Sequence, residues 1–100
     1  MRLKRLTKKI QHNVFISENK KLLNEFIDGI KTNKYPIRER SQRLKALPIE
    51  VVREIGKKII FSDCDGFNTV SKEAELSYFD NLDRWQKEYF IEQRFYKLLN

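Results

Sequence analysis

The chain has 100 residues, of which 40% are hydrophobic and 35% are charged, and its formal net charge is +7. A length of this order fits one domain, and the hydrophobic share excludes a disordered chain. The single cysteine excludes an intramolecular disulfide and a zinc site with two thiolates, and apolar runs of at most three residues exclude a membrane span of about 20 residues.

Charge divides the chain into two unequal parts. Residues 1–60 hold 16 Lys or Arg against 6 Asp or Glu, whereas residues 61–100 hold 5 against 8. We expect the basic part to attract a polyanion and the remainder to serve packing or a different partner. The alternative is that the two parts complement each other electrostatically within the fold.

Residues 1–16 form a basic arm whose secondary structure the pattern leaves open. Leu3, Leu6 and Ile10 follow helical spacing, but Val14-Phe15-Ile16 is more typical of extended chain. The cations of the arm have no acidic neighbour and are Arg2, Lys4, Arg5, Lys8 and Lys9. No apolar stretch or small-residue cleavage site follows these cations, so we expect no signal peptide and a cytoplasmic protein.

The segment after Ser17 predicts the first clear helix of a basic helical region, residues 17–60. Its hydrophobic residues recur at i, i+1, i+4, i+5 and i+8 and are Leu22, Leu23, Phe26, Ile27 and Ile30. This spacing places them on one helical face, and Ser17 is a favourable N-cap. Asn33 tolerates the left-handed conformation and Pro36 restricts the residue before it, so we expect the helix to end near Asn33.

Two prolines predict two further helices in the basic region. Pro36 can open a helix with a narrow apolar seam, and Pro48 can open another with a wider buried stripe. The narrow seam consists of Ile37, Leu44 and Leu47. The β-branched and aromatic residues Ile59-Ile60-Phe61 favour strands, so one short strand is an alternative to helix at the end of the second element. The composition of residues 62–71 predicts a loop.

Residues 72–99 predict an aromatic C-terminal helical region that is bent or broken near Asp80-Asn81. Asp80 and Asp83 could form a carboxylate version of the capping box. One helical face carries Leu82, Trp85, Tyr89, Tyr96 and Leu99, and a second carries Ile91, Phe95 and Leu98. A helix this apolar is either the central helix of a bundle or half of a dimer contact. We expect Trp85 to be buried, within the fold or against another chain.

Together these elements predict a mostly α protein, a small bundle of four to five helices formed by residues 1–100 as a single domain. A domain of this length buries only about 60–65% of the surface that its unfolded chain exposes. We therefore expect marginal stability unless a partner or a second copy adds buried surface.

Residues 59–66 resemble the first motif of haloacid-dehalogenase-type phosphatases, an apolar strand followed by Asp-x-Asp-Gly. The resemblance implies a nucleophile at Asp63 and an acid/base at Asp65. However, the family's later motifs need more chain than follows, and a carboxylate without magnesium ligands and a phosphate cradle stabilises no transition state. A calcium loop fails because Phe61 and Lys72 stand where acidic ligands are needed. We interpret the two aspartates as part of a solvated turn.

No nucleophile, base and orienting group can be assembled from this sequence. His12 has no partner at catalytic or ligand spacing, and Cys64 stands between two aspartates whose charges disfavour the thiolate. We therefore predict no enzyme activity, no metal site, no cofactor, no small-molecule substrate and no membrane partner.

The leading hypothesis is a small non-enzymatic protein that engages nucleic acid or a nucleoprotein complex through its basic half. Clustered cations bind phosphates favourably because counterions are released. The candidate residues are Arg2, Lys4, Arg5, Lys8, Lys9, Arg38, Arg40, Arg43 and Lys45. The helices around Lys34-Tyr35-Pro36 could form a helix-turn-helix whose groove-facing residues are Arg38, Ser41, Gln42 and Lys45. The alternative for these cations is a merely solvated surface.

The rival hypothesis is a protein-directed adaptor or inhibitor, of the kind that phages and other mobile elements encode, or a homodimer. Nine of the twelve aromatic residues fall from Phe61 onward, in the acidic part, whereas base stacking works best with rings interleaved among cations. Trp and Tyr often anchor protein interfaces, so the candidate interface residues are Trp85, Tyr89 and Tyr96. The other interpretation of these rings is core packing.

Overall fold

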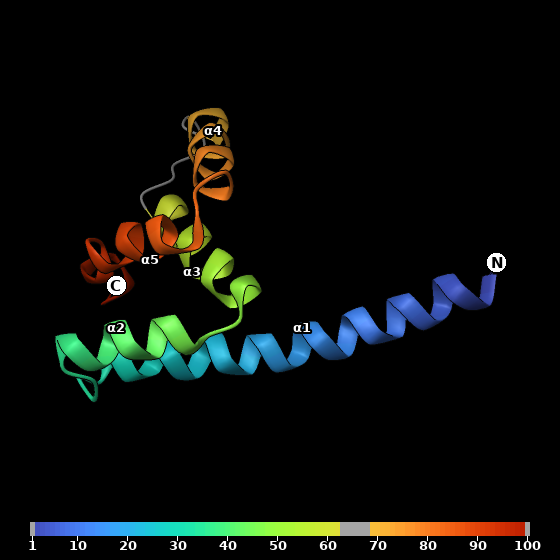
Figure 1. Ribbon diagram of the computed structural model, residues 1–100, viewed down its shortest axis with the longest axis horizontal. Helices are drawn as coiled ribbons and strands as arrows, with labels where there is room; N and C mark the ends of the chain where they lie inside the picture. The colour runs from blue at the N-terminus through green and yellow to red at the C-terminus, as the bar shows by residue number, and fades with distance from the viewer. Residues whose placement is uncertain (1, 63–68, 100) are drawn as a thin grey trace.

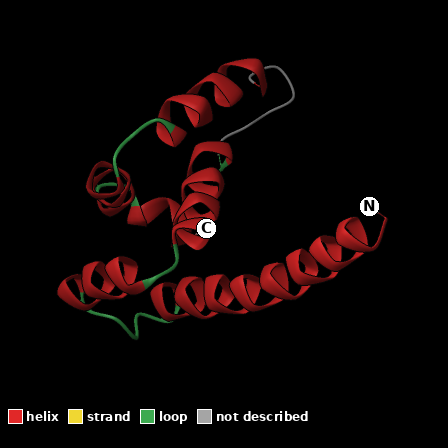
Figure 2. Cartoon of the chain, turned by 45° about the vertical axis from the view of Figure 1, so that its right-hand side comes forward, coloured by secondary structure: helices red, strands yellow, loops and turns green. Residues whose placement is uncertain are grey.

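The structure, a computed structural model, describes the backbone of residues 2–62 and 69–99 and the side chains of residues 17–62 and 69–99. Within these ranges the chain forms five α-helices and a short 3₁₀-helix, with no strand (Figure 2). They are α1 (Arg2–Lys31), α2 (Ile37–Ala46), α3 (Ile49–Phe61), α4 (Thr69–Asp80), α5 (Arg84–Glu92) and η1 (Phe95–Leu99). The predicted small helical bundle is confirmed, and no described helix is both long and apolar enough to cross a bilayer.

The helix α1 is longer than predicted, because it is continuous from Arg2 rather than starting at Ser17. The expectation of extended chain at Val14-Phe15-Ile16 is wrong, since β-branched and aromatic residues lose only tenths of a kcal/mol in a helix. At 1.5 Å per residue, its 30 residues span about 45 Å. Figure 1 shows its N-terminal end lying apart from the other helices. The predicted end is confirmed, since Asn33 follows with a positive φ of 58°.

The helices α2 and α3 begin where the two prolines predict, although Pro36 and Pro48 are the N-cap residues and the first helical residues are Ile37 and Ile49. The buried residues of α3 are Val51, Val52, Ile55, Gly56, Ile59 and Ile60. This repeat of three and four residues is the helical period, and it continues through the last turn of α3. The short strand considered at Ile59-Ile60-Phe61 is therefore wrong: burial on one helical face outweighs the modest β preference of these residues.

The centre of the bundle is α3, not the aromatic C-terminal helix. It contacts α1, α4, α5 and η1, and Figure 1 shows it between α1 with α2 on one side and α4 on the other. Each α-helix contributes at least one fully buried side chain to the core, and examples are Ile30, Leu44, Ile55, Phe79 and Ile91. The core is therefore shared, and the apolar face of each helix is buried only when the other helices pack against it.

The packing of α4 on α3 depends on a glycine and on an ion pair. A Cβ atom at Gly56 would overlap the ring of Phe79, which packs edge-on against Phe90 with ring centroids 5.2 Å apart. Arg53 of α3 donates to both carboxylate oxygens of Asp80 at the end of α4, at 2.9 and 3.1 Å. The hydrogen bond to Asp80 raises the pKa of Arg53.

The C-terminal region is interrupted at the predicted place, but its capping box is not the predicted one. Asp83 has an extended backbone, and its N–H donates to Oε1 of Gln86 at 2.9 Å in a box formed by these two residues. Asp80 cannot be the N-cap because it is the last residue of α4. The helix α4 also begins at Thr69, inside the expected loop of residues 62–71. Residues 63–68, which include the phosphatase-like motif and Cys64, lie outside the described residues.

Candidate nucleic-acid interface

The five predicted arm cations belong to the N-terminal end of α1, and their residues are Arg2, Lys4, Arg5, Lys8 and Lys9. Residues 2–16 contain no Asp or Glu. The arm is a helical extension of an element whose other end is fixed in the core by Phe26 and Ile30. The side chains of the arm lie outside the described residues, as does His12.

The four predicted cations of α2 divide into two pairs with different surroundings. Arg38 and Lys45 are exposed, and within the described residues neither side chain makes a hydrogen bond or an ion pair. Arg40 donates through Nε to the backbone oxygen of Tyr35 at 2.9 Å and through Nη2 to Asn33 Oδ1 at 3.1 Å. Arg40 therefore holds the connection between α1 and α2, whereas the first pair is free to meet a ligand.

Arg43 is the second cation of α2 that is occupied within the fold. Its Nε and Nη2 donate to Glu39 Oε1 at 3.2 and 3.0 Å. Its guanidinium also stacks on the ring of Tyr35, 4.0 Å from the ring centroid. The same ring also packs so closely on Gly29 that a Cβ atom there would overlap it. Arg43 thus helps to clamp Tyr35 between α1 and α2.

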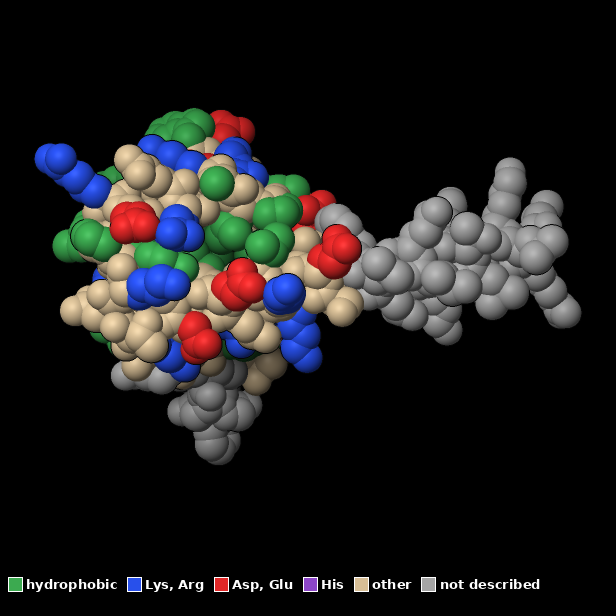
Figure 3. Space-filling model, turned by 90° about the horizontal axis from the view of Figure 1, so that it is seen from below, with side chains coloured by type: hydrophobic (Ala, Val, Ile, Leu, Met, Phe, Trp, Pro, Cys, Tyr) green, Lys and Arg blue, Asp and Glu red, His purple; other side chains and the backbone are tan. Residues whose placement is uncertain are grey.

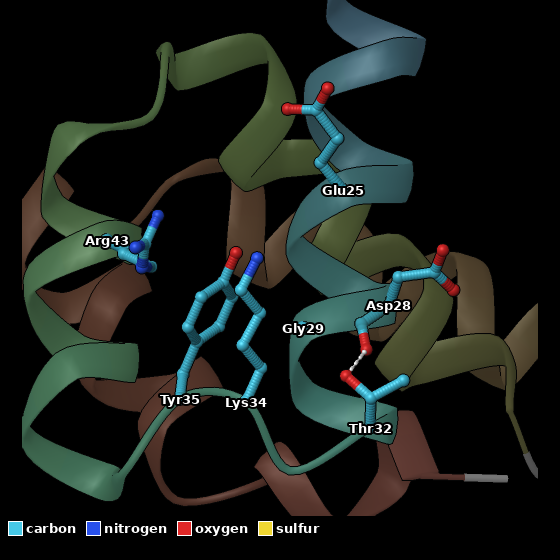
Figure 4. A pocket seen from close by; sticks show the side chains of 7 residues that line it. All are labelled: Glu25, Asp28, Gly29, Thr32, Lys34, Tyr35 and Arg43. Carbon is cyan, nitrogen blue, oxygen red and sulfur yellow. Dashed lines mark hydrogen bonds between the residues drawn. The ribbon is translucent and has the colours of Figure 1, made fainter.

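A cavity of about 580 Å³ opens beside Tyr35 (Figure 4). Its lining residues are Glu25, Asp28, Gly29, Thr32, Lys34, Tyr35 and Arg43. The lining holds two carboxylates and two cations, so its formal charges balance and it lacks the positive potential of a phosphate site. Figure 4 shows the cations beside the ring and the Glu25 carboxylate above it. We interpret the cavity as part of the connection between α1 and α2.

The residues predicted to face a DNA groove lie on one face of α2. Arg38, Gln42 and Lys45 are exposed and Ser41 is half-buried, while Leu44 on another face is buried. However, α2 packs on α5 more than on α1. In this respect α1 and α2 differ from a helix-turn-helix, whose two helices form one unit.

Charge on the described surface of α1 and α2 is mixed. Figure 3 shows this face, where Lys and Arg side chains lie among Asp and Glu side chains. Glu25 and Asp28 of α1 and Glu39 of α2 contribute acidic groups to this region. The stretch of cations without acids is therefore residues 2–16.

The predicted interface residues Trp85, Tyr89 and Tyr96 lie at the surface, where their exposed fractions are 66%, 57% and 62%. Core packing, one of the two interpretations of these rings, is therefore wrong for these three residues. The other interpretation, an interface in which Trp85 is buried against another chain, stays a prediction. The buried residues of α5 and η1 are Glu88, Ile91, Phe95 and Leu98. The sequence indicates two apolar faces for this region. The buried one includes Glu88, and a charged residue is not expected on a buried face.

Arg84 explains how a carboxylate lies on the buried face of α5. Its Nε donates to Oε2 of Glu88 at 2.9 Å. Its Nη2 donates to the backbone oxygens of Lys45 at 3.1 Å and Leu47 at 2.6 Å, at the end of α2. Ile37, at the other end of α2, is 75% exposed, so its expected place in an apolar seam is wrong. The ion pair with Glu88 has the helical i, i+4 spacing, but no sequence spacing indicates the contacts of Arg84 with α2, because those partners lie almost forty residues away.

Within the described residues, no three His, Cys, Asp or Glu side chains gather where they could hold a metal ion. Asp63 and Asp65, the acidic pair of the phosphatase-like motif, fall outside that search. Comparisons of the chain with protein-family models, with curated proteins and with solved structures find no match.

Proposed function

We propose that the chain binds nucleic acid, and that the N-terminal half of α1 is the element that engages the phosphates. The supporting observation is that α1 is one continuous helix with five cations and no acid in residues 2–16 and with its C-terminal half fixed in the core. A helix fixed at one end presents its charges without a large loss of chain entropy on binding.

The dimensions of the element suit a duplex. An α-helix with its side chains is about 10–12 Å wide, and the major groove of B-DNA is about 12 Å wide. Cations on such a helix can reach phosphates on either side of the groove. Arg38 and Lys45 add two unoccupied cations on α2. Arg40 and Arg43 are assigned to the connection between α1 and α2 rather than to phosphates.

The test compares two sets of glutamine substitutions by fluorescence anisotropy with a labelled duplex of mixed sequence. The arm variant replaces Arg2, Lys4, Arg5, Lys8 and Lys9 by Gln, which keeps a strong helix-forming residue at each position. We expect its affinity at about 0.1 M salt to fall at least about a hundredfold, because five phosphate contacts are lost.

The control variant carries Lys57→Gln and Lys58→Gln in α3. Both lysines are exposed, and within the described residues neither has an ion-pair partner. We expect its affinity to stay within about threefold of the unmodified chain. Equal losses in the two variants, or no duplex binding by the unmodified chain at low salt, would contradict the proposal.

A second candidate function is directed at a protein partner, and the exposure of Trp85, Tyr89 and Tyr96 favours it. Large exposed aromatic side chains are the residues that most often anchor interfaces. Capture of partners from a lysate with and without nuclease separates the two candidates. Partners that persist after nuclease treatment support the second, and partners that disappear support the first.

A further inference from the structure

The side chain of Tyr35 is buried, yet its hydroxyl has no partner in the fold. The residue is only 7% exposed. Among the residues that the structure describes, none hydrogen-bonds to this hydroxyl, and its oxygen is accessible from the cavity between α1 and α2. Figure 4 shows the hydroxyl at the free end of the ring, directed into the cavity. A buried tyrosine hydroxyl usually has a hydrogen-bond partner, so we look for one outside the chain.

Two cations lie beside the same ring. The Arg43 guanidinium is 4.0 Å from the centroid of the Tyr35 ring, and the Lys34 ammonium is 6.0 Å from it. Within the described residues, the Lys34 side chain makes no hydrogen bond or ion pair. Arg43 donates to Glu39 through Nε and Nη2 and keeps Nη1 available. A hydroxyl donor beside an ammonium and a guanidinium suits an anionic oxygen, as in a carboxylate.

A carboxylate faces these donors across the cavity. Glu25 of α1 is exposed, and its side chain has no hydrogen bond or ion pair in the described part of the chain. Figure 4 shows its carboxylate above the Tyr35 hydroxyl, whereas the Asp28 carboxylate is directed away from the ring. Glu25 would repel a phosphate and attract an ammonium group. The cavity therefore suits a ligand that carries a carboxylate and an ammonium together.

The position of the Tyr35 hydroxyl is fixed before any ligand arrives. The ring lies directly on α1 because Gly29 has no Cβ atom, which would overlap it. Arg40 donates to the backbone oxygen of Tyr35 at 2.9 Å and holds the backbone of this residue. A group held in this way loses little further freedom on binding. The cavity volume of about 580 Å³ is also within the range of about 300–1,000 Å³ that is typical of small-molecule sites.

We propose that the cavity beside Tyr35 binds a small zwitterion, an α-amino acid in its free form. The Tyr35 hydroxyl and the Lys34 ammonium donate to its carboxylate, and the Glu25 carboxylate accepts from its ammonium. The inference does not rest on phosphate binding by the arm, because the cavity is formed at the other end of α1. No reaction is proposed at this site, so the prediction that the chain has no small-molecule substrate is unaffected.

Two-dimensional NMR of the full-length protein tests the binding, with free alanine, leucine, phenylalanine, serine, glutamate and lysine as probes. We expect at least one probe to shift the backbone N–H signals of Gly29, Lys34 and Tyr35 with a dissociation constant below about 1 mM. Its N-acetyl derivative lacks the ammonium and its carboxamide derivative lacks the carboxylate, so each should bind at least about tenfold more weakly. No shift with any probe at about 10 mM, or a derivative that binds as tightly as the parent, would overturn the proposal.

The variant Tyr35→Phe separates a role of the hydroxyl in binding from the packing of the ring. It removes one oxygen and keeps the ring on Gly29, so the urea midpoint should not change, whereas the affinity for the probe should fall at least about tenfold. Tyr78→Phe is the matched control, since Tyr78 of α4 is 63% exposed and lies outside the cavity lining. We expect this control to bind the probe as the unmodified chain does.

A second pair of variants leaves Tyr35 intact. Lys34→Gln should weaken binding at least about threefold, whereas Lys31→Gln should not, because Lys31 is an exposed lysine of α1 outside the lining of this cavity. Circular dichroism checks that each variant is folded. An unchanged affinity in Tyr35→Phe or Lys34→Gln, an equal loss in a variant and its control, or a lower urea midpoint for Tyr35→Phe would each overturn the proposal.

Discussion

At the scale of single residues, two aromatic side chains of the C-terminal region have opposite environments. The ring of Phe79 is fully buried against Gly56 and Phe90, whereas Trp85 is 66% exposed. Both rings belong to stretches that alternate apolar and charged residues, so their sequence surroundings do not distinguish them. The environment is decided by which face of each helix meets α3, a property of the whole bundle.

This difference predicts unequal losses of stability on truncation to alanine. Phe79→Ala should lower the free energy of unfolding by about 3–5 kcal/mol, because it leaves a cavity between α3 and α4. Trp85→Ala should lower it by less than about 1 kcal/mol, because an exposed ring loses few contacts. Urea denaturation at low protein concentration, where association does not contribute, measures both values. A loss for Trp85→Ala comparable to that for Phe79→Ala would show that the ring is part of the core.

At the scale of elements, most helices could be predicted from the sequence because their signals are local. Pro36, Pro48 and Asn33 mark helix ends through fixed or left-handed backbone angles, and α3 repeats its buried residues with the helical period. The start of α1 could not be predicted, because the residues Val14-Phe15-Ile16 disfavour helix by only tenths of a kcal/mol each. The buried face of α5 could not be predicted either, because it carries the charged residue Glu88 and is defined by the packing of α5 on α3 and α2.

The contacts of Arg84 predict that it stabilises the packing of α5 on α2. Arg84→Gln removes the ion pair with Glu88 and the hydrogen bonds to the end of α2, so the free energy of unfolding should fall by about 2 kcal/mol. Arg38→Gln is the control, since within the described residues Arg38 has no partner, and it should change stability by less than about 0.5 kcal/mol. Equal midpoints in urea for the two variants would refute this role of Arg84.

At the scale of the whole molecule, the acid-free cluster of cations and the residues of the hydrophobic core lie in different parts of the chain. The core is drawn from all five α-helices, whereas the acid-free stretch of cations is confined to one end of α1. Within the described residues, Arg53 with Asp80 is an ion pair between the basic and the acidic parts of the chain, so some electrostatic complementarity exists. The sequence indicates the basic candidate residues, but the assignment of Arg40 and Arg43 to the connection between α1 and α2 follows from contacts with Tyr35 that only the fold creates.

The salt dependence of duplex affinity tests the central claim most directly. Phosphate contacts by the five arm cations, with Arg38 and Lys45, should give a slope of log affinity against log salt of about −6. The slope should be about 4.5 units shallower in the arm variant with five glutamines, because each lost phosphate contact contributes about 0.9. An affinity that does not change with salt, or a slope that is the same in the two proteins, would contradict the assignment of α1 as the phosphate-binding element.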